Sequence, residues 1–172
     1  MIGQLVVGVG DCLVSDDPES VLVTYALGSC VAVAIHDPVA KVGGLLHFML
    51  PESGIDRDKA QRNPFMFADT GIPLLFHSAY GLGAQKKRLV VAAAGGAQMM
   101  DAQGVFNIGK RNCLALRRIL WKAGVMVHAE DLGGLVSRTM RLDVASGRVS
   151  LRGAGEREQD LLAAQSPPGR NF

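Results

Sequence analysis

The sequence predicts an α/β fold of the mixed α+β kind: a single domain with mixed or antiparallel β-sheets and about two main helices. Its 172 residues suit one domain of ordinary size. Hydrophobic residues make up 48% of the chain and charged residues 20%, which is typical of a globular protein with a substantial core. Many short apolar runs are joined as hairpins, and only two segments have helical periodicity.

Short apolar runs bounded by turn residues predict the strands. In chain order these runs are residues 4–9, 21–25, 31–35, 43–50, 88–93, 125–129, 137–144 and 148–152. The third and fourth runs are joined by the loop Asp37–Lys41, which contains Pro38, and the last two are joined by Ala145–Gly147. Both connections are rich in turn residues, so each pair of runs is expected to form a hairpin.

Two segments have the apolar spacing of helices. In the first, residues 65–80, apolar side chains recur at helical intervals, but Pro73 lies inside it. We expect Pro73 to kink this helix, or the regular helix to begin near Gly71. The second helix is expected over residues 109–123 and to end at Gly124.

Two polar segments have no apolar period. Residues 52–62 follow the His47 run and predict a surface loop, which is either a plain connector or a mobile lid beside a functional site. Residues 153–172 predict a flexible C-terminal tail in which residues 161–164 could form a transient helix. The folded domain is therefore expected to span residues 1–152.

Charge and cysteine content bound the functional class. The net charge of +2 gives no electrostatic footprint for nucleic acid. Cys12, Cys30 and Cys113 are widely spaced and predict neither a disulfide framework nor a metal site, and no cofactor motif is present. No signal peptide and no membrane span are apparent, so we expect a cytoplasmic protein without membrane insertion, whose thiols stay reduced.

Cys30 and His47 are the candidate reactive pair. Cys30 follows the turn Gly28–Ser29 and precedes a buried strand, so its sulfur can be both fixed and accessible. His47 lies in the next strand, and a hairpin would bring the two residues alongside each other. A cysteine and a histidine are the minimal equipment for thiol nucleophilic catalysis.

Each of these residues also has a structural interpretation. Cysteine is among the most buried residue types and often only fills space in a core. A histidine in an apolar strand is often a satisfied core residue, and Thr24 is an ordinary β-branched strand residue. The residue types alone leave both interpretations open.

The order of many short blocks resembles the CheD family of chemoreceptor glutamine deamidases over about residues 4–152. The blocks that carry the resemblance are Thr24, Leu27–Val31, Asp37–Pro38, Gly43–Gly44, His47–Pro51, Phe67–Asp69, Ile72–Leu75, Leu82–Ala84, Gly95–Ala97, Ile108–Asn112, Asp131–Gly134 and Ser146–Val149. The resemblance implies a layered fold similar to that of deamidating bacterial toxins. It also implies an active site made of Cys30, His47 and Thr24.

The resemblance implies a hydrolase of chemotaxis, a protein-glutamine deamidase. Its expected substrate is the cytoplasmic domain of methyl-accepting chemotaxis receptors, where specific Gln side chains would become Glu with release of ammonia through a thioester. A CheC-type phosphatase is the further protein partner that it implies. Two other functions stay open at this point: a chemotaxis adaptor without catalysis, and a cysteine hydrolase of a small amide or ester.

Overall fold

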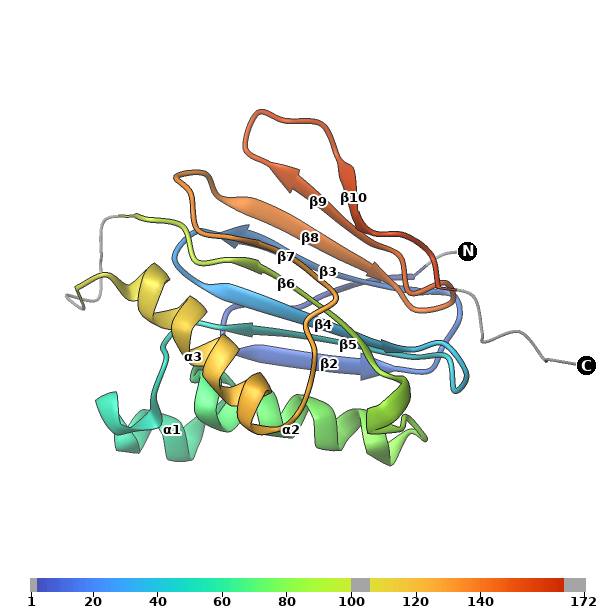
Figure 1. The fold of residues 1–172 in the computed structure, drawn as a ribbon, viewed down its shortest axis with the longest axis horizontal. Coiled ribbons are helices and arrows are strands. Elements are labelled where there is room, and N and C mark those ends of the chain that lie inside the picture. The colour runs from blue at the N-terminus through green and yellow to red at the C-terminus, as the bar shows by residue number, and fades with distance from the viewer. Residues whose placement is uncertain (1–2, 100–105, 166–172) are drawn as a thin grey trace, which may run out of the picture.

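Two five-stranded sheets form the body of the protein, and the helices cover one of them (Figure 1). The structure is a computed structural model that describes residues 3–99 and 106–165. The first sheet has the strand order β1-β3-β8-β9-β10 and the second the order β2-β5-β4-β6-β7. Both sheets are mixed, because each contains parallel and antiparallel pairs: β1–β3 and β6–β7 are parallel, and β3–β8 and β4–β6 are antiparallel. This confirms the predicted fold class.

The strands lie as follows in the sequence. They are β1 Gly3–Val6, β2 Asp11–Ser15, β3 Ser20–Leu27, β4 Val31–Asp37, β5 Val42–Phe48, β6 Val90–Gly95, β7 Ala129–Leu132, β8 Arg138–Asp143, β9 Val149–Gly153 and β10 Gln159–Leu162. The α-helices are α1 Arg57–Arg62, α2 Ala68–Gly81 and α3 Ile108–Lys122, and short 3₁₀ turns cover Ser53–Ile55, Pro64–Met66 and Lys86–Arg88.

The central strand β4 is buried along its whole length because both faces of its sheet are covered. Val31, Val33 and Ile35 pack into the apolar cluster shared with α2 and α3. Ala32 and Ala34 point the other way, into the cluster between the two sheets. This two-sided burial is why the sequence reads as a continuous apolar run instead of an alternating one.

Both predicted hairpins are confirmed. β4 pairs antiparallel with β5 from Val31–Phe48 to Asp37–Val42, and β8 pairs antiparallel with β9. The helix predicted over residues 65–80 begins at Ala68, after a separate 3₁₀ turn, and not near Gly71. Pro73 lies inside α2 on its exposed side.

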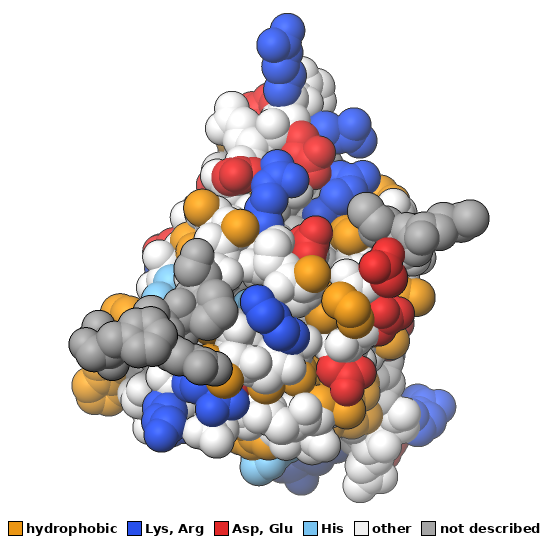
Figure 2. Space-filling model, turned by 90° about the vertical axis from the view of Figure 1, so that its right-hand side faces the viewer, with side chains coloured by type: hydrophobic (Ala, Val, Ile, Leu, Met, Phe, Trp, Pro, Cys, Tyr) orange, Lys and Arg blue, Asp and Glu red, His pale blue; other side chains and the backbone are white. Residues whose placement is uncertain are grey.

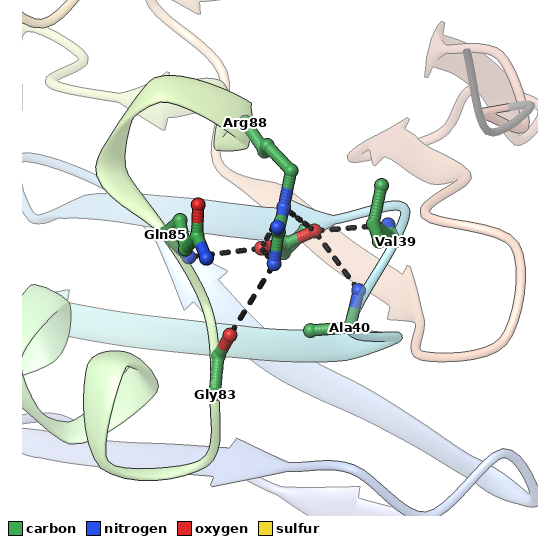
Figure 3. Close-up of polar contacts among 6 residues, drawn as sticks. Val39, Ala40, Gly83, Gln85 and Arg88 are labelled. Carbon is green, nitrogen blue, oxygen red and sulfur yellow. Dashed lines mark hydrogen bonds and ion pairs between the residues drawn. The ribbon is translucent and has the colours of Figure 1, made fainter.

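Asp37 fixes the turn between β4 and β5 (Figure 3). Its buried carboxylate accepts hydrogen bonds from the amides of Val39, Ala40 and Gln85 and forms an ion pair with Arg88 at 2.9 Å. Burial alone would raise the pKa of Asp37, but the Arg88 guanidinium and the three amides hold it below its ordinary value. One carboxylate thus ties the hairpin to the segment that leads from α2 into β6.

Two sequence predictions about helical structure are wrong. Residues 52–62 contain the helix α1, in which Ala60 packs against a small apolar cluster and the other side chains are polar. The helix is started by Asp56, whose side chain accepts from the Lys59 amide at 3.0 Å. A short helix that is started by its cap and has a single half-buried alanine leaves no apolar period to detect. Of residues 161–164, which could have formed a transient helix, the first two instead end the strand β10, which pairs antiparallel with β9, and the other two follow it without regular structure. The predicted domain boundary at residue 152 therefore excludes an ordered strand, and the last part of the predicted tail, 166–172, lies outside the described residues.

The strand expected over residues 125–129 is displaced toward the C-terminus. Val125 donates its amide to Leu120 at the end of α3, and Val125 and Val127 pack on the cluster under the helices. This apolar run closes the helix layer. Hydrogen bonding to β6 starts at His128, whose amide donates to the Val91 carbonyl, and the strand itself starts at Ala129. β2, a short edge strand paired with β5, is missing from the sequence prediction.

The end of the molecule at the right of Figure 1, which carries the β4–β5 turn, mixes Lys and Arg with Asp and Glu (Figure 2). Hydrophobic atoms are scattered between these charges. Among the described residues that Figure 2 shows, side chains of both charges occur on this face.

Candidate active site

Cys30 lies one residue before β4, in a loop that rests on the end of β6. The Cys30 carbonyl accepts from the Gly96 amide, and the Gly28 carbonyl accepts from the Ala97 amide, both at 2.8 Å. The contact requires a glycine at residue 95, where φ is +115° and a Cβ atom would lie 2.2 Å from the Cys30 oxygen. The half-buried thiol is therefore carried by a segment that is anchored on both sides of it.

His47 and Thr24 meet between the two sheets. His47 belongs to β5 and Thr24 to β3 of the other sheet, and both are fully buried. Thr24 Oγ1 lies 2.7 Å from His47 Nδ1 and donates to the Val7 carbonyl at 2.6 Å. The expected approach of Thr24 to His47 is thus present in the structure.

The hydroxyl of Thr24 defines the tautomer of His47. A hydroxyl has one hydrogen, and the Val7 carbonyl can only accept, so that hydrogen lies toward Val7. Thr24 Oγ1 must then accept from His47, which places the imidazole hydrogen on Nδ1. Nε2 keeps its lone pair, and it has no hydrogen-bond partner among the described residues.

Cys30 and His47 lie on the same face of the β4–β5 pair. His47 is directly opposite Ala32, and Cys30 is two residues before Ala32, so the two form a diagonal pair. Ala32 points into the cluster between the sheets, and Cys30 packs against that same cluster. Cys12 is opposite Leu46 and packs on the helix side, and Cys113 belongs to α3.

Burial shifts the pKa of both groups away from the charged form. It raises the pKa of the Cys30 thiol to about 11, although a backbone amide acts in the opposite direction. It lowers the pKa of His47 to about 4. Near pH 7 the resting pair is therefore a neutral thiol and a neutral imidazole.

The other three histidines lie away from Cys30. His36 is at the far end of β4, buried, with Nε2 2.8 Å from the Val144 carbonyl. His77 is exposed on α2. His128 accepts from the Val91 amide at 3.1 Å, at the end of β6 opposite to Gly95.

Asn112 is a site residue that sequence reasoning did not single out. It lies on the buried face of α3, and its Nδ2 donates to the carbonyls of Ser29 and Met49, each at 2.9 Å. A polar side chain in the middle of an apolar helix face was the available signal, since Ile108, Cys113 and Leu116 are buried around it. Arg138 of β8 contacts the end of β6, where its guanidinium donates to the Gly95 carbonyl at 3.2 Å.

A hollow of about 870 Å³ lies beside the Cys30 loop. Its lining includes Gly96, whose amide donates to the Cys30 carbonyl, and Met99, whose side chain lies 3.3 Å from the position that a Cβ atom on Gly28 would take. Phe106 and Leu135 on its rim are 83% and 74% exposed, so the hollow is open to the surface and not an enclosed cavity. The hollow is thus an open groove next to the loop that carries Cys30.

Two further properties concern the described residues, 3–99 and 106–165. Within them, no three His, Cys, Asp or Glu side chains come together as a metal site requires. None of the helices in these ranges has both the length and the apolar character needed to cross a membrane.

Comparison with known proteins identifies the family to which this protein belongs. Residues 49–153 match the family model CheD, described as CheD chemotactic sensory transduction. The chain belongs to the CheD family, as its sequence predicted. It is 56% identical over 168 residues to the "Probable chemoreceptor glutamine deamidase CheD" of Solibacter usitatus, covering 98% of this chain and 99% of that protein.

A second relative is the "Chemoreceptor glutamine deamidase CheD" of Thermotoga maritima, 42% identical over 154 residues, which cover 90% of this chain and 94% of that protein. Among solved structures, the chain is similar to the Bacillus licheniformis hypothetical protein YfiH, with 14% identity, a TM-score of 0.43, and coverage of 73% of this chain and 49% of that chain. Nothing about function follows from so low a score.

Proposed function

We propose that this protein is a chemoreceptor glutamine deamidase in which Cys30 is the nucleophile and His47 the acid and base. The observation that carries the proposal is the hydrogen-bonded chain from Val7 through Thr24 to His47 Nδ1, which leaves Nε2 as a base on the face shared with Cys30. The names of the relatives support the same activity.

The reaction begins when Cys30 Sγ attacks the carbon of a Gln side-chain amide while its proton moves to His47 Nε2. The neutral resting pair makes His47 a general base during attack, since no thiolate is stored beforehand. Backbone amides around Ser29 and Cys30 are the proposed donors to the oxyanion, and losing one such donor costs about 3 kcal/mol in other enzymes.

The second half of the reaction returns the site to its starting state. The tetrahedral intermediate expels ammonia, which takes the proton from Nε2, and a thioester to Cys30 remains. Water then attacks the thioester with Nε2 as base, and the Cys30 thiol leaves with that proton. The sum converts Gln and water to Glu and ammonia.

The role of Thr24 is to orient the imidazole and fix its tautomer, as the third member of a triad does. Its hydroxyl carries no charge, which suits a histidine whose pKa is already lowered to about 4 by burial. Thr24 therefore holds the base in place without adding a negative charge beside it.

The proposed substrate is the cytoplasmic part of a methyl-accepting chemotaxis receptor, so the proposed location is the cytoplasm. The open hollow beside the Cys30 loop supports a protein substrate. A CheC-type phosphatase is the further proposed partner. Co-purification of the two proteins at micromolar concentration tests that partner, and its absence under those conditions would argue against it.

Mass spectrometry tests the activity. The protein is incubated with receptor cytoplasmic fragments, and a gain of one mass unit at a defined Gln is expected. The Cys30→Ala variant should fold normally and produce no gain, while Cys12→Ala should remain active. Binding of the fragments without any mass change would indicate an adaptor instead, and hydrolysis confined to small amides or esters would indicate the small-molecule enzyme.

A further inference from the structure

The two segments that carry Cys30 and His47 separate at one end of the β4–β5 ladder. The last paired residues are Val31 and Phe48. Beyond them the backbone bonds lead in different directions: the Cys30 carbonyl accepts from Gly96 in the direction of β6, whereas Met49 donates to the Met66 carbonyl at 2.9 Å. Catalysis by both residues requires that these diverging segments keep one fixed separation.

Asn112 joins the two segments at this point. Its Nδ2 atom has two hydrogens, and they go to the carbonyls of Ser29 and Met49 at 2.9 Å each. Ser29 directly precedes Cys30, and Met49 follows His47 by two residues. One amide nitrogen therefore continues the connection between the segments where the ladder stops.

The helix that carries Asn112 sits at a fixed depth. A Cβ atom on Gly109 would lie 2.4 Å from the Ala97 carbonyl, and one on Gly96 would lie 2.2 Å from Cys113 Sγ. These contacts between the first turns of α3 and the end of β6 leave no room for the helix to slide. Asn112 thus links the two segments to a rigid support.

Among the described residues, the side-chain amide of Asn112 makes no hydrogen bond besides the two to Ser29 and Met49. It is fully buried, and its Oδ1 has no hydrogen-bond partner among the described residues. An unpaired buried oxygen opposes folding, and a leucine of similar size would avoid that penalty without holding either carbonyl. The two donated bonds are what distinguishes asparagine at this position.

We propose that Asn112 is a positioning residue for the reaction, which keeps Cys30 and the amides beside it at a fixed separation from His47 Nε2. This inference rests on the proposed function. Because its side chain is fully buried, Asn112 touches no substrate and acts only through the two carbonyls that it holds. Its loss should therefore lower kcat and leave KM nearly unchanged.

The Asn112→Leu variant tests this with receptor fragments as substrate. We expect kcat to fall about 100-fold, the loss that a small misplacement of reacting groups produces, with KM within about twofold of the original. The control is Arg88→Met, which weakens the fold at the Asp37 turn, far from Cys30, and should keep the original kcat. Equal kcat losses in the two variants, or an unchanged kcat in Asn112→Leu, would overturn the proposal.

A second measurement is independent of activity. Iodoacetamide should alkylate Cys30 several-fold faster in Asn112→Leu than in the original protein, because the loop is released from Met49, while the rate at Cys12 stays the same. An unchanged rate at Cys30 counts against the proposal. If the original protein does not deamidate receptor fragments, the proposed function fails, and the alkylation rates still decide what Asn112 does. Should Asn112→Leu not fold, Asn112→Ser, too short to hold both carbonyls, takes its place.

Discussion

At the residue scale, burial keeps both reactive groups neutral. Cys30 and His47 have pKa values of about 11 and about 4, so the thiol holds its proton until a substrate is attacked. A stored thiolate–imidazolium pair would instead need both values shifted toward the charged forms. The neutral pair also protects the thiol from oxidation, since thiolates are the species that oxidise.

The pH dependence of kcat/KM should reflect this neutral pair. Activity should rise as His47 loses its proton with a pKa of about 4 and stay level until the pH approaches the Cys30 value of about 11. Rates measured between about pH 5 and pH 10 on one receptor fragment check this. A decrease of kcat/KM centred at about pH 8 to 9 would instead indicate an imidazolium that must stay protonated, as in a stored thiolate–imidazolium pair.

Thr24→Val should separate the role of the hydroxyl from that of the side-chain shape. Valine fills the same space but neither accepts from His47 Nδ1 nor donates to Val7. We expect kcat to fall about 100-fold, because the imidazole loses its fixed tautomer. Nitrogen NMR of the imidazole should show a larger share of the Nε2–H form, and Thr24→Ser should restore both readouts. Full activity in Thr24→Val would remove Thr24 from the mechanism.

At the scale of single elements, the β4–β5 hairpin is held at one end by Asp37 and at the other by Asn112. The Asp37 carboxylate collects three amides and Arg88, and Asn112 joins Ser29 to Met49. Removing one member of a buried ion pair is costly because the other charge stays buried and unpaired. The hairpin is therefore fixed by polar contacts at its two ends, of which the end held by Asn112 lies beside Cys30 and the end held by Asp37 lies far from it.

Arg88→Met should lower the free energy of unfolding by about 3 kcal/mol, since Asp37 is fully buried and loses its cation. Urea denaturation monitored by circular dichroism measures the loss. Arg148→Met is the matched control, because its ion pair with Asp160 is about half exposed and should contribute less than about 1 kcal/mol. Equal effects of the two substitutions would show that Asp37 does not depend on Arg88.

The sequence predicted those elements whose apolar pattern is local. Both hairpins and α3 follow from runs and periods inside one segment, as does the placement of Cys30 before a strand and His47 in the next. α1 depends on the Asp56 cap, and β10 depends on β9, so neither has a pattern of its own. Thr24 was found through the family resemblance, whereas Asn112 acts only after α3 packs beside two distant segments. The direction of the pKa shifts also requires the burial that packing creates.

At the scale of the whole molecule, acid should destabilise the fold through its buried histidines. The pKa of His47 is about 4 in the folded protein against an ordinary value of 6.5. The unfolded chain therefore takes up the proton first, so stability is intact above pH 6.5 and falls as the pH decreases toward about 4. Burial lowers the pKa of His36 as well, which adds to the effect.

His47→Gln should reduce this acid sensitivity. The His47 shift corresponds to about 3 kcal/mol between pH 7 and pH 4, and the variant should lose that much less on acidification, whatever its stability at pH 7. Urea denaturation at several pH values gives the comparison. Parallel curves for the original protein and the variant would place the folded pKa of His47 near its ordinary value.

The hydrogen bond between Thr24 and His47 joins two sheets that are completed at different times during synthesis. Thr24 lies on β3, which pairs with β1 and with β8, and β8 is made more than a hundred residues after Thr24. A ribosome-bound chain that ends before Arg138 already contains Thr24, Cys30, His47 and every strand of the second sheet, but it lacks β8, the antiparallel partner of β3. In such a nascent chain β3 has β1 but not β8 to pair with, so the contact that sets the His47 tautomer depends on a strand whose own sheet is not yet complete.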